Sequence, residues 1–251
     1  MRWRRVAAAG VAALLGAAAC SSGSSSGTSS SGAAPASGAA ATGAVGPPAS
    51  VPAGDPAKSV AAVDGIVVTE ASFNAELNAI GSVPSYLDAT DLTLTPSNVA
   101  TRLPQGGFDP GYVRLLLRRR VLLALVEHEL ALRGTAVSDT CRQAAVDHLA
   151  DALSGDRTEG QAFLAAFPQS YRDDLVTWNA EVRELQALLS GLPCDTTDPS
   201  AQDKVGTAYG TWLDATLPTA QIAVAANYGT WDTASGTILP PGGIAATTVP
   251  Q

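Results

Sequence analysis

A leucine-rich segment from Tyr112 to Arg133 constrains the fold of this chain more than any other feature. On an α-helix its apolar side chains surround almost the whole circumference; they are Val113, Leu116, Leu117, Val121, Leu123, Leu125, Val126 and Leu130. A helix that is apolar on nearly every side is buried on every side, which predicts a central position. Arg114 and the run Arg118 to Arg120 interrupt the segment, and charges at mid-bilayer are costly, so we do not expect a membrane span.

More helices are predicted after the central one, which should end at Gly134. Ser138 or Asp139 is a suitable cap for the next helix, whose weaker apolar face consists of Ala144, Ala145, Leu149 and Leu153. Two further helices are expected at about 158–167 and 168–189, and a short one at about 204–216.

Two short β-prone runs precede these helices and predict a hairpin. Val60 to Val63 and Ile66 to Val68 flank Asp64-Gly65, a dipeptide that favours the type I′ turn. Thr69 is a suitable N-cap for a helix that reaches about Gly81. A strand at Gln221 to Val224 is expected to join this hairpin. The predicted fold class is therefore mainly α, a helical bundle with a small antiparallel β-sheet formed by the N-terminal hairpin and a C-terminal strand.

The segment from Ser82 to Pro110 is predicted to be an irregular connection. It is rich in proline, threonine, aspartate and glycine, and its apolar periodicity is weak, although a short helix is expected near 96–102. Gly106-Gly107 precedes Phe108-Asp109-Pro110 rather than a helix with lysine or serine in place, so we interpret the pair as a loop and not as a phosphate site.

The N-terminus has the pattern of an export signal. Residues 1–19 combine three early arginines, an apolar run from Val6 to Leu15 and small residues before Cys20. Cys20 directly after Ala17-Ala18-Ala19 resembles the bacterial lipobox, in which the cysteine is diacylated and becomes the mature N-terminus. We therefore expect a lipid anchor on Cys20 at the extracytoplasmic face of the cell membrane. Cleavage near Ala19 with an incidental Cys20 would instead give an ordinary secreted protein.

Composition divides the remainder of the chain. Residues 20–58 are serine, glycine, alanine and proline with no charge before Asp55, which predicts a disordered tether after the lipidated cysteine. Residues 59–241 are expected to form one folded domain, and residues 242–251 a flexible tail.

Charge and residue counts exclude several classes of function. The net charge is −8 and no basic cluster exceeds Arg118 to Arg120, so we expect no nucleic-acid binding. Only two histidines are present. His128 lies between Glu127 and Glu129, which point in different directions on a helix, and His148 with two aspartates fits a solvated face, so no metal and no cofactor are expected. No nucleophile-and-base pattern is visible, and no catalytic residue is predicted.

Two cysteines remain once Cys20 is lipidated, namely Cys141 and Cys194. An even pair in an oxidising compartment predicts a disulfide. A redox-active cysteine would need a CxxC motif or a partner base, and neither is visible.

The order of several segments resembles one known family. The segments are VAAVDGIVVT at 60–69, a helix with Phe73 and Leu77, the leucine-rich helix that ends in ELALRGTAVSD at 129–139, and NYGTWD at 227–232. This order is similar to the N-terminal, chaperone-like domain of the bacterial extracytoplasmic foldases related to SurA, PrsA and trigger factor, over roughly 59–241. Many members carry a prolyl isomerase domain before the closing segment. Only Gly191 to Asp203 occupy that position here, so isomerase activity is not expected.

The resemblance implies a non-catalytic lipoprotein that binds unfolded or exported polypeptides. It also implies an apolar client groove, for which the candidate residues are Trp178, Tyr209, Trp212, Tyr228 and Trp231. Core packing is the alternative role for these aromatic side chains. The alternative function is that of a structural or adaptor lipoprotein that binds one specific envelope protein.

Overall fold

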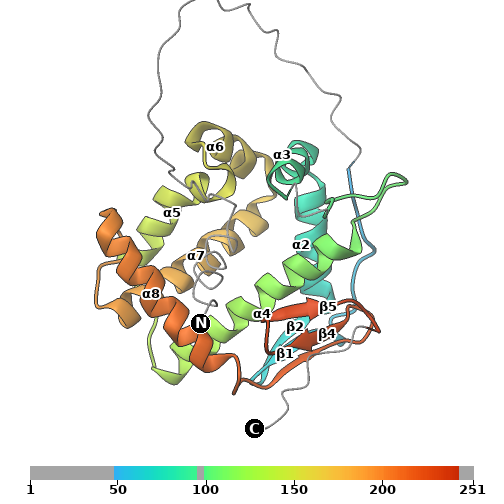
Figure 1. The fold of residues 1–251 in the computed structure, drawn as a ribbon. Coiled ribbons are helices and arrows are strands. Elements are labelled where there is room, and N and C mark those ends of the chain that lie inside the picture. The colour runs from blue at the N-terminus through green and yellow to red at the C-terminus, as the bar shows by residue number, and fades with distance from the viewer. Residues whose placement is uncertain (1–47, 95–98, 243–251) are drawn as a thin grey trace, which may run out of the picture.

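The computed structural model describes residues 48–94 and 99–242, which form seven helices and five strands (Figure 1). In chain order the elements are β1 (Ser59–Val63), β2 (Ile66–Thr69), α2 (Glu70–Gly81), α3 (Pro84–Leu94), α4 (Pro110–Leu132), α5 (Asp139–Ser154), α6 (Arg157–Ala166), α7 (Gln169–Ser190), α8 (Pro199–Thr216), β3 (Ile222–Val224), β4 (Thr230–Asp232) and β5 (Thr237–Leu239). The fold is mainly helical with a small antiparallel sheet, as predicted.

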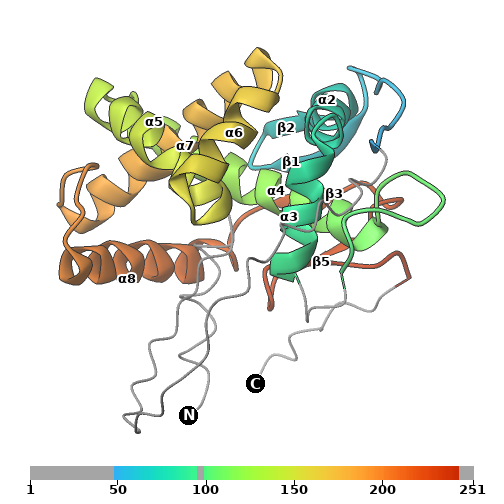
Figure 2. The ribbon, with the colours of Figure 1, turned by 90° about the horizontal axis from the view of Figure 1, so that it is seen from above.

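Helix α4 lies at the centre of the fold, and the predicted central position is confirmed. Asp109 caps its N-terminus by accepting a hydrogen bond from the Gly111 amide, and Pro110 opens the first turn, where its missing N–H costs nothing. Ten of its 23 residues are buried. Figures 1 and 2 show α5 to α8 on one side of α4, and α2 with the strands on the other.

The three-stranded sheet has the order β2-β1-β3, and every pair is antiparallel. Asp64 (φ 47°) and Gly65 (φ 90°) both adopt positive φ, as a type I′ turn between β1 and β2 requires. The late strand β3 pairs with β1, with Ala62 opposite Ala223. The Asp64 amide donates to the Gln221 carbonyl, and the Asp64 carboxylate accepts from the Gln221 amide. The two ends of the domain are thus joined in one sheet.

Strands β4 and β5 form a second hairpin against the same side of α4. The Nε of Arg118 in α4 donates to the carbonyl of Gly236 in the turn of this hairpin. Tyr228, just before β4, makes an edge-to-face contact with Phe73 of α2, with ring centroids 5.8 Å apart. The closing segment is therefore held by both α4 and α2.

The remaining helices pack around α7, which contacts α4, α5 and α8. Helix α5 also packs on α6, and Gly160 of α6 lies directly against the backbone of Ala150 in α5. A Cβ atom added at Gly160 would lie 1.8 Å from the Ala150 carbonyl oxygen. This close approach of two helices explains why glycine occupies the position.

Gly160→Ala is expected to destabilise the domain by about 1–3 kcal/mol, because the two helix backbones must move apart to admit the methyl group. Gly210→Ala in α8 is the matched control: its Cβ would meet open space, so about 0.5–1 kcal/mol of stabilisation is expected from helix propensity. Urea denaturation of both variants measures these changes. Equal effects of the two substitutions would contradict the tight α5–α6 contact.

The prediction of an irregular connection at 82–110 was wrong in part. Helix α3 occupies Pro84–Leu94, whereas 99–102 are not helical and 95–98 lie outside the described residues. Leu87 is fully buried, and the Tyr86 ring makes edge-to-face contacts with Phe163 and Phe167. Tertiary packing therefore stabilises a segment whose own sequence pattern is weak.

Part of the segment expected as a tether packs on the domain. Residues 48–58, expected as the end of the tether, lie along α2 instead. Ala49 is buried and its amide donates to the Gly81 carbonyl, while the Asn74 side chain donates to the Pro52 carbonyl. The expected signal peptide, Cys20 and the rest of the tether, and tail residues 243–251, lie outside the described residues.

Candidate functional site

The five aromatic residues predicted to line a client groove do not share one surface. Tyr209 and Trp212 lie together on α8, with ring centroids 5.2 Å apart, and both are buried. Trp231 is also buried, and Trp178 and Tyr228 are half-buried. Core packing, the alternative interpretation, thus describes Tyr209, Trp212 and Trp231 in this conformation.

The two half-buried members of this set contact different parts of the core. Trp178 of α7 packs on Tyr171 and on two arginines of α4, whereas Tyr228 packs on Phe73 of α2. Of the candidate groove residues, the structure therefore brings together only the α8 pair, Tyr209 and Trp212.

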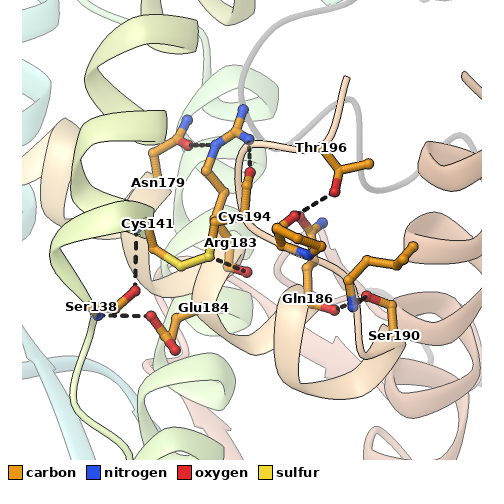
Figure 3. The surroundings of a disulfide bond; sticks show 11 residues. Ser138, Cys141, Asn179, Arg183, Glu184, Gln186, Ser190, Cys194 and Thr196 are labelled. Carbon is orange, nitrogen blue, oxygen red and sulfur yellow. Dashed lines mark hydrogen bonds between the residues drawn. A yellow bond between two sulfur atoms is a disulfide. The ribbon is translucent and has the colours of Figure 1, made fainter. Parts of the chain in front are cut away.

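The predicted disulfide between Cys141 and Cys194 is present (Figure 3). Cys141 lies in the first turn of α5, where its amide donates to Oγ of the N-cap Ser138. Cys194 lies in the connection between α7 and α8, and its carbonyl accepts from Nη1 of Arg183. The bond fixes the start of α5 to the chain just before α8.

The same region contains three groups that could in principle ligate a metal. A carboxylate oxygen of Glu184 and the sulfurs of Cys141 and Cys194 lie within 4.8 Å of one another. The Glu184 carboxylate already accepts a hydrogen bond from the Ser138 amide (Figure 3). With both sulfurs in a disulfide, thiolate ligands do not exist here, so the group acts as a structural clamp.

A buried ionic cluster lies where α2, α4 and α7 meet, and the sequence interpretation missed it. The Glu76 side chain is only 2% exposed and forms ion pairs with Arg119 and with Arg120, whose Nε lies 3.6 Å from Oε2. Nη2 of Arg119 also donates to the hydroxyl of Tyr171, and burial raises the pKa of that tyrosine. We call Glu76, Arg119, Arg120 and Tyr171 the ionic core.

Trp178 covers one side of the ionic core. Its ring centroid lies 4.2 Å from Cζ of Arg120 and 5.8 Å from Cζ of Arg119, which places both guanidinium groups within cation–π distance. One carboxylate, two guanidinium groups and one indole thus share a largely desolvated space. These contacts give Trp178 a structural role in the core.

One signal in the sequence could have revealed this cluster. Three consecutive residues of an α-helix spread over about 200° of its circumference. Because α4 is apolar on nearly all sides, at least one residue of the run Arg118 to Arg120 had to face the interior and needed an acidic partner. The partner Glu76 is 43 residues away from Arg119, and only the fold identifies it.

Glu181 of α7 is a second acidic residue whose surroundings change its pKa, and it lies near Glu127 and Arg120 of α4. Burial, with a smaller contribution from the charge of Glu127, raises the pKa of Glu181 to about 7, although Arg120 and Arg142 act in the opposite direction. The folded state thus retains a proton that the unfolded chain loses near pH 4.5. The free energy of unfolding contributed by Glu181 therefore falls as the pH rises from about 4.5 to about 7.

Glu181→Gln is expected to remove this pH dependence. The variant should match the wild type near pH 4 and exceed it in stability at pH 8, since its side chain carries no charge to bury. Chemical denaturation at several pH values measures the difference between the two proteins. A difference that stays constant from pH 4 to pH 8 would contradict the raised pKa.

Neither histidine belongs to a cluster of candidate metal ligands among the described residues. Glu129, next to His128, pairs with Arg133 along the helix. Asp151, near His148, pairs with Arg157, which also bonds the Asp147 carbonyl. The side chains of Asp151 and Arg157 are about half exposed, so this pair lies on the helix surface.

A surface hollow of about 250 Å³ lies between the end of α3 and the turn at 103–107. Its lining residues are Pro48, Asp91, Arg102, Leu103, Pro104, Gly106 and Gly107. Gly106 and Gly107 adopt positive φ within this loop, as expected for a turn. None of the predicted groove residues lines the hollow.

Within 48–94 and 99–242, no helix is both long and apolar enough to cross a membrane. Comparison of the chain with protein-family models, curated proteins and solved structures found no match. The fold and site therefore define a class by architecture alone: a mainly helical domain closed by a small antiparallel sheet, with a disulfide clamp and a buried ionic core.

Proposed function

We propose that this protein is a lipid-anchored extracytoplasmic protein whose domain binds unfolded or exported polypeptides without catalysing a reaction. The path of the chain supports the proposal. An N-terminal hairpin leads into helices, and the late strand β3 returns to pair with β1. The hairpin, the helices and the closing segment follow one another in the order on which the resemblance to the SurA, PrsA and trigger-factor family rests.

The connection between α7 and α8 supports the non-catalytic part of the proposal. It consists of residues 191–198 and is fixed by the disulfide at Cys194. Eight residues cannot form an independently folded domain. Many members of the resembled family carry a prolyl isomerase domain at this position. Here a short loop held by the disulfide occupies it.

An adaptor that binds one envelope protein is the second candidate function. The burial of Tyr209, Trp212 and Trp231 favours it, because these predicted groove residues are not exposed in this conformation. Cross-linking in intact cells distinguishes the two functions. Many different exported polypeptides are expected if the domain binds unfolded chains, whereas a single stoichiometric partner would overturn that proposal and support the adaptor.

Cys20→Ser removes the thiol that is expected to carry the lipid. Since stable anchoring depends on the acyl chains, the protein should move from the membrane fraction to the soluble extracytoplasmic fraction. Cell fractionation of the wild type and of this single-substitution variant measures the distribution. Retention of the variant in the membrane fraction would contradict the lipid anchor.

A further inference from the structure

Helix α8 is held on the protein by few buried residues. Only Tyr209 and Trp212 are buried among its 18 residues, compared with 10 of 23 in α4 and 7 of 22 in α7. Local opening requires the least free energy where few side chains are buried. Although α8 lies along α7, its low burial leads us to expect that it opens more readily than the other long helices.

Polar contacts do not compensate for this low burial. Among the described residues, the side-chain hydrogen bonds of α8 stay within the helix or reach the connection before it, as from Gln202 to the Thr196 carbonyl. The hydroxyl of Tyr209 and Nε1 of Trp212 are buried without a hydrogen-bond partner. Opening would hydrate both groups, which lowers its cost.

The backbone of α8 is also weakened at two positions. Gly206 and Gly210 lie inside the helix, where glycine is unfavourable, and a Cβ atom at either would meet open space. No close packing therefore requires glycine here.

The chain on both sides of α8 is fixed, so that the helix can open and return. Cys194 is bonded to Cys141 before the helix, and Arg183 holds the Cys194 carbonyl. After the helix, the Leu217 side chain lies beside Gly236, and β3 joins the sheet. In Figure 2, α8 runs along one border of the molecule and packs on α7.

We infer that α8 covers the polypeptide-binding surface of this protein, and that a segment of a non-native chain carrying aromatic side chains takes the place of Tyr209 and Trp212 on it. The inference rests on the proposed function and names its binding surface. In this structure the rings of Tyr209 and Trp212 occupy the covered surface, so it accommodates large aromatic side chains. Arg118 lies near enough for its positive charge to oppose the effect of burial on the pKa of Tyr209. A second copy of the protein is disfavoured as the occupant, since both copies carry a net charge of −8.

Two altered proteins test the inference in opposite directions. Gly206→Ala with Gly210→Ala stabilises the helix without a clash, whereas Thr211→Pro breaks the helix at an exposed position. The probe is a labelled peptide of residues 199–216, and its control is the same peptide with Tyr209→Ala and Trp212→Ala. Thr158→Ala, at an exposed position of α6, serves as the control protein.

Hydrogen exchange of the full-length purified protein should be faster in α8 than in α4. The glycine-to-alanine double variant should slow exchange in α8 and weaken peptide binding by about five- to thirty-fold, while Thr211→Pro strengthens binding. Equal hydrogen-exchange rates in α8 and α4 overturn the inference. It is also overturned if neither protein variant changes the affinity for the probe and the peptide without the two rings binds equally well. If the inference about α8 fails in this way but the protein still suppresses aggregation of a denatured protein, the proposed function stands. If neither the wild type nor any variant suppresses aggregation, the inference and the proposed function are both wrong.

Discussion

Glu76→Gln is expected to lower the free energy of unfolding by about 3–5 kcal/mol, the effect of breaking a buried ion pair. The substitution leaves Arg119 and Arg120 without a counter-charge, although their side chains are only 11% and 17% exposed. Removal of one partner is costly because the remaining charges stay desolvated. Urea denaturation of the variant and the wild type measures the change.

Asp151→Asn is the matched control for this prediction. Asp151 also pairs with an arginine, Arg157, but both side chains are about half exposed, so a much smaller loss of stability than that of Glu76→Gln is expected. Arg119→Met combined with Glu76→Gln should cost less than the sum of the two single substitutions, since the groups interact directly. Equal costs of Glu76→Gln and Asp151→Asn would contradict the buried ionic core.

Replacing both Cys141 and Cys194 with alanine is expected to lower the free energy of unfolding by about 4 kcal/mol in the chain-entropy model. The bond joins cysteines that are 53 positions apart, and the loop that it closes contains all of α6 and α7. In the unfolded chain this closure removes conformational freedom, so its loss favours unfolding. Denaturation of the oxidised wild type and of the double variant measures the difference.

Reduction provides the control for the disulfide prediction. A dithiol reductant should destabilise the wild type by a similar amount and leave the double alanine variant unchanged, because that variant has no bond to reduce. If the variant and the oxidised wild type unfold at the same denaturant concentration, the clamp does not stabilise the domain.

The parts of the fold that local signals specify were predicted from the sequence. Asp64-Gly65 predicts the β1–β2 turn, Thr69 predicts the start of α2, and the all-round apolar segment predicts the central α4. These features depend on turn chemistry, caps and periodicity, which act over a few residues. The sequence also predicted that a strand at Gln221 to Val224 joins the hairpin, but the structure was needed to show that it pairs with β1.

Helix α3 could not be predicted in the same way. Its sequence, PSYLDATDLTL, contains threonine and aspartate, which favour helices weakly, and only Leu87 is buried. Its stability comes from contacts of Tyr86 with Phe163 and Phe167, which are about 80 residues away in the chain. Such contacts leave no periodic pattern in α3 itself.

The candidate site was predicted in part, for a similar reason. The disulfide follows from cysteine count and compartment, whereas the ionic core depends on which faces of α2, α4 and α7 meet. The candidate groove residues were chosen as a cluster in sequence. Their burial depends on where α8 and the closing segment pack, which sequence proximity does not specify.

Aggregation of a chemically denatured model protein, diluted with and without the oxidised protein, tests the central proposal most directly. We expect suppression of aggregation at near-stoichiometric ratios, because a domain that binds unfolded polypeptides shields their apolar segments. Albumin at the same concentration is the control for non-specific protection. Aggregation that proceeds unchanged at a several-fold molar excess of the protein would contradict polypeptide binding as its function.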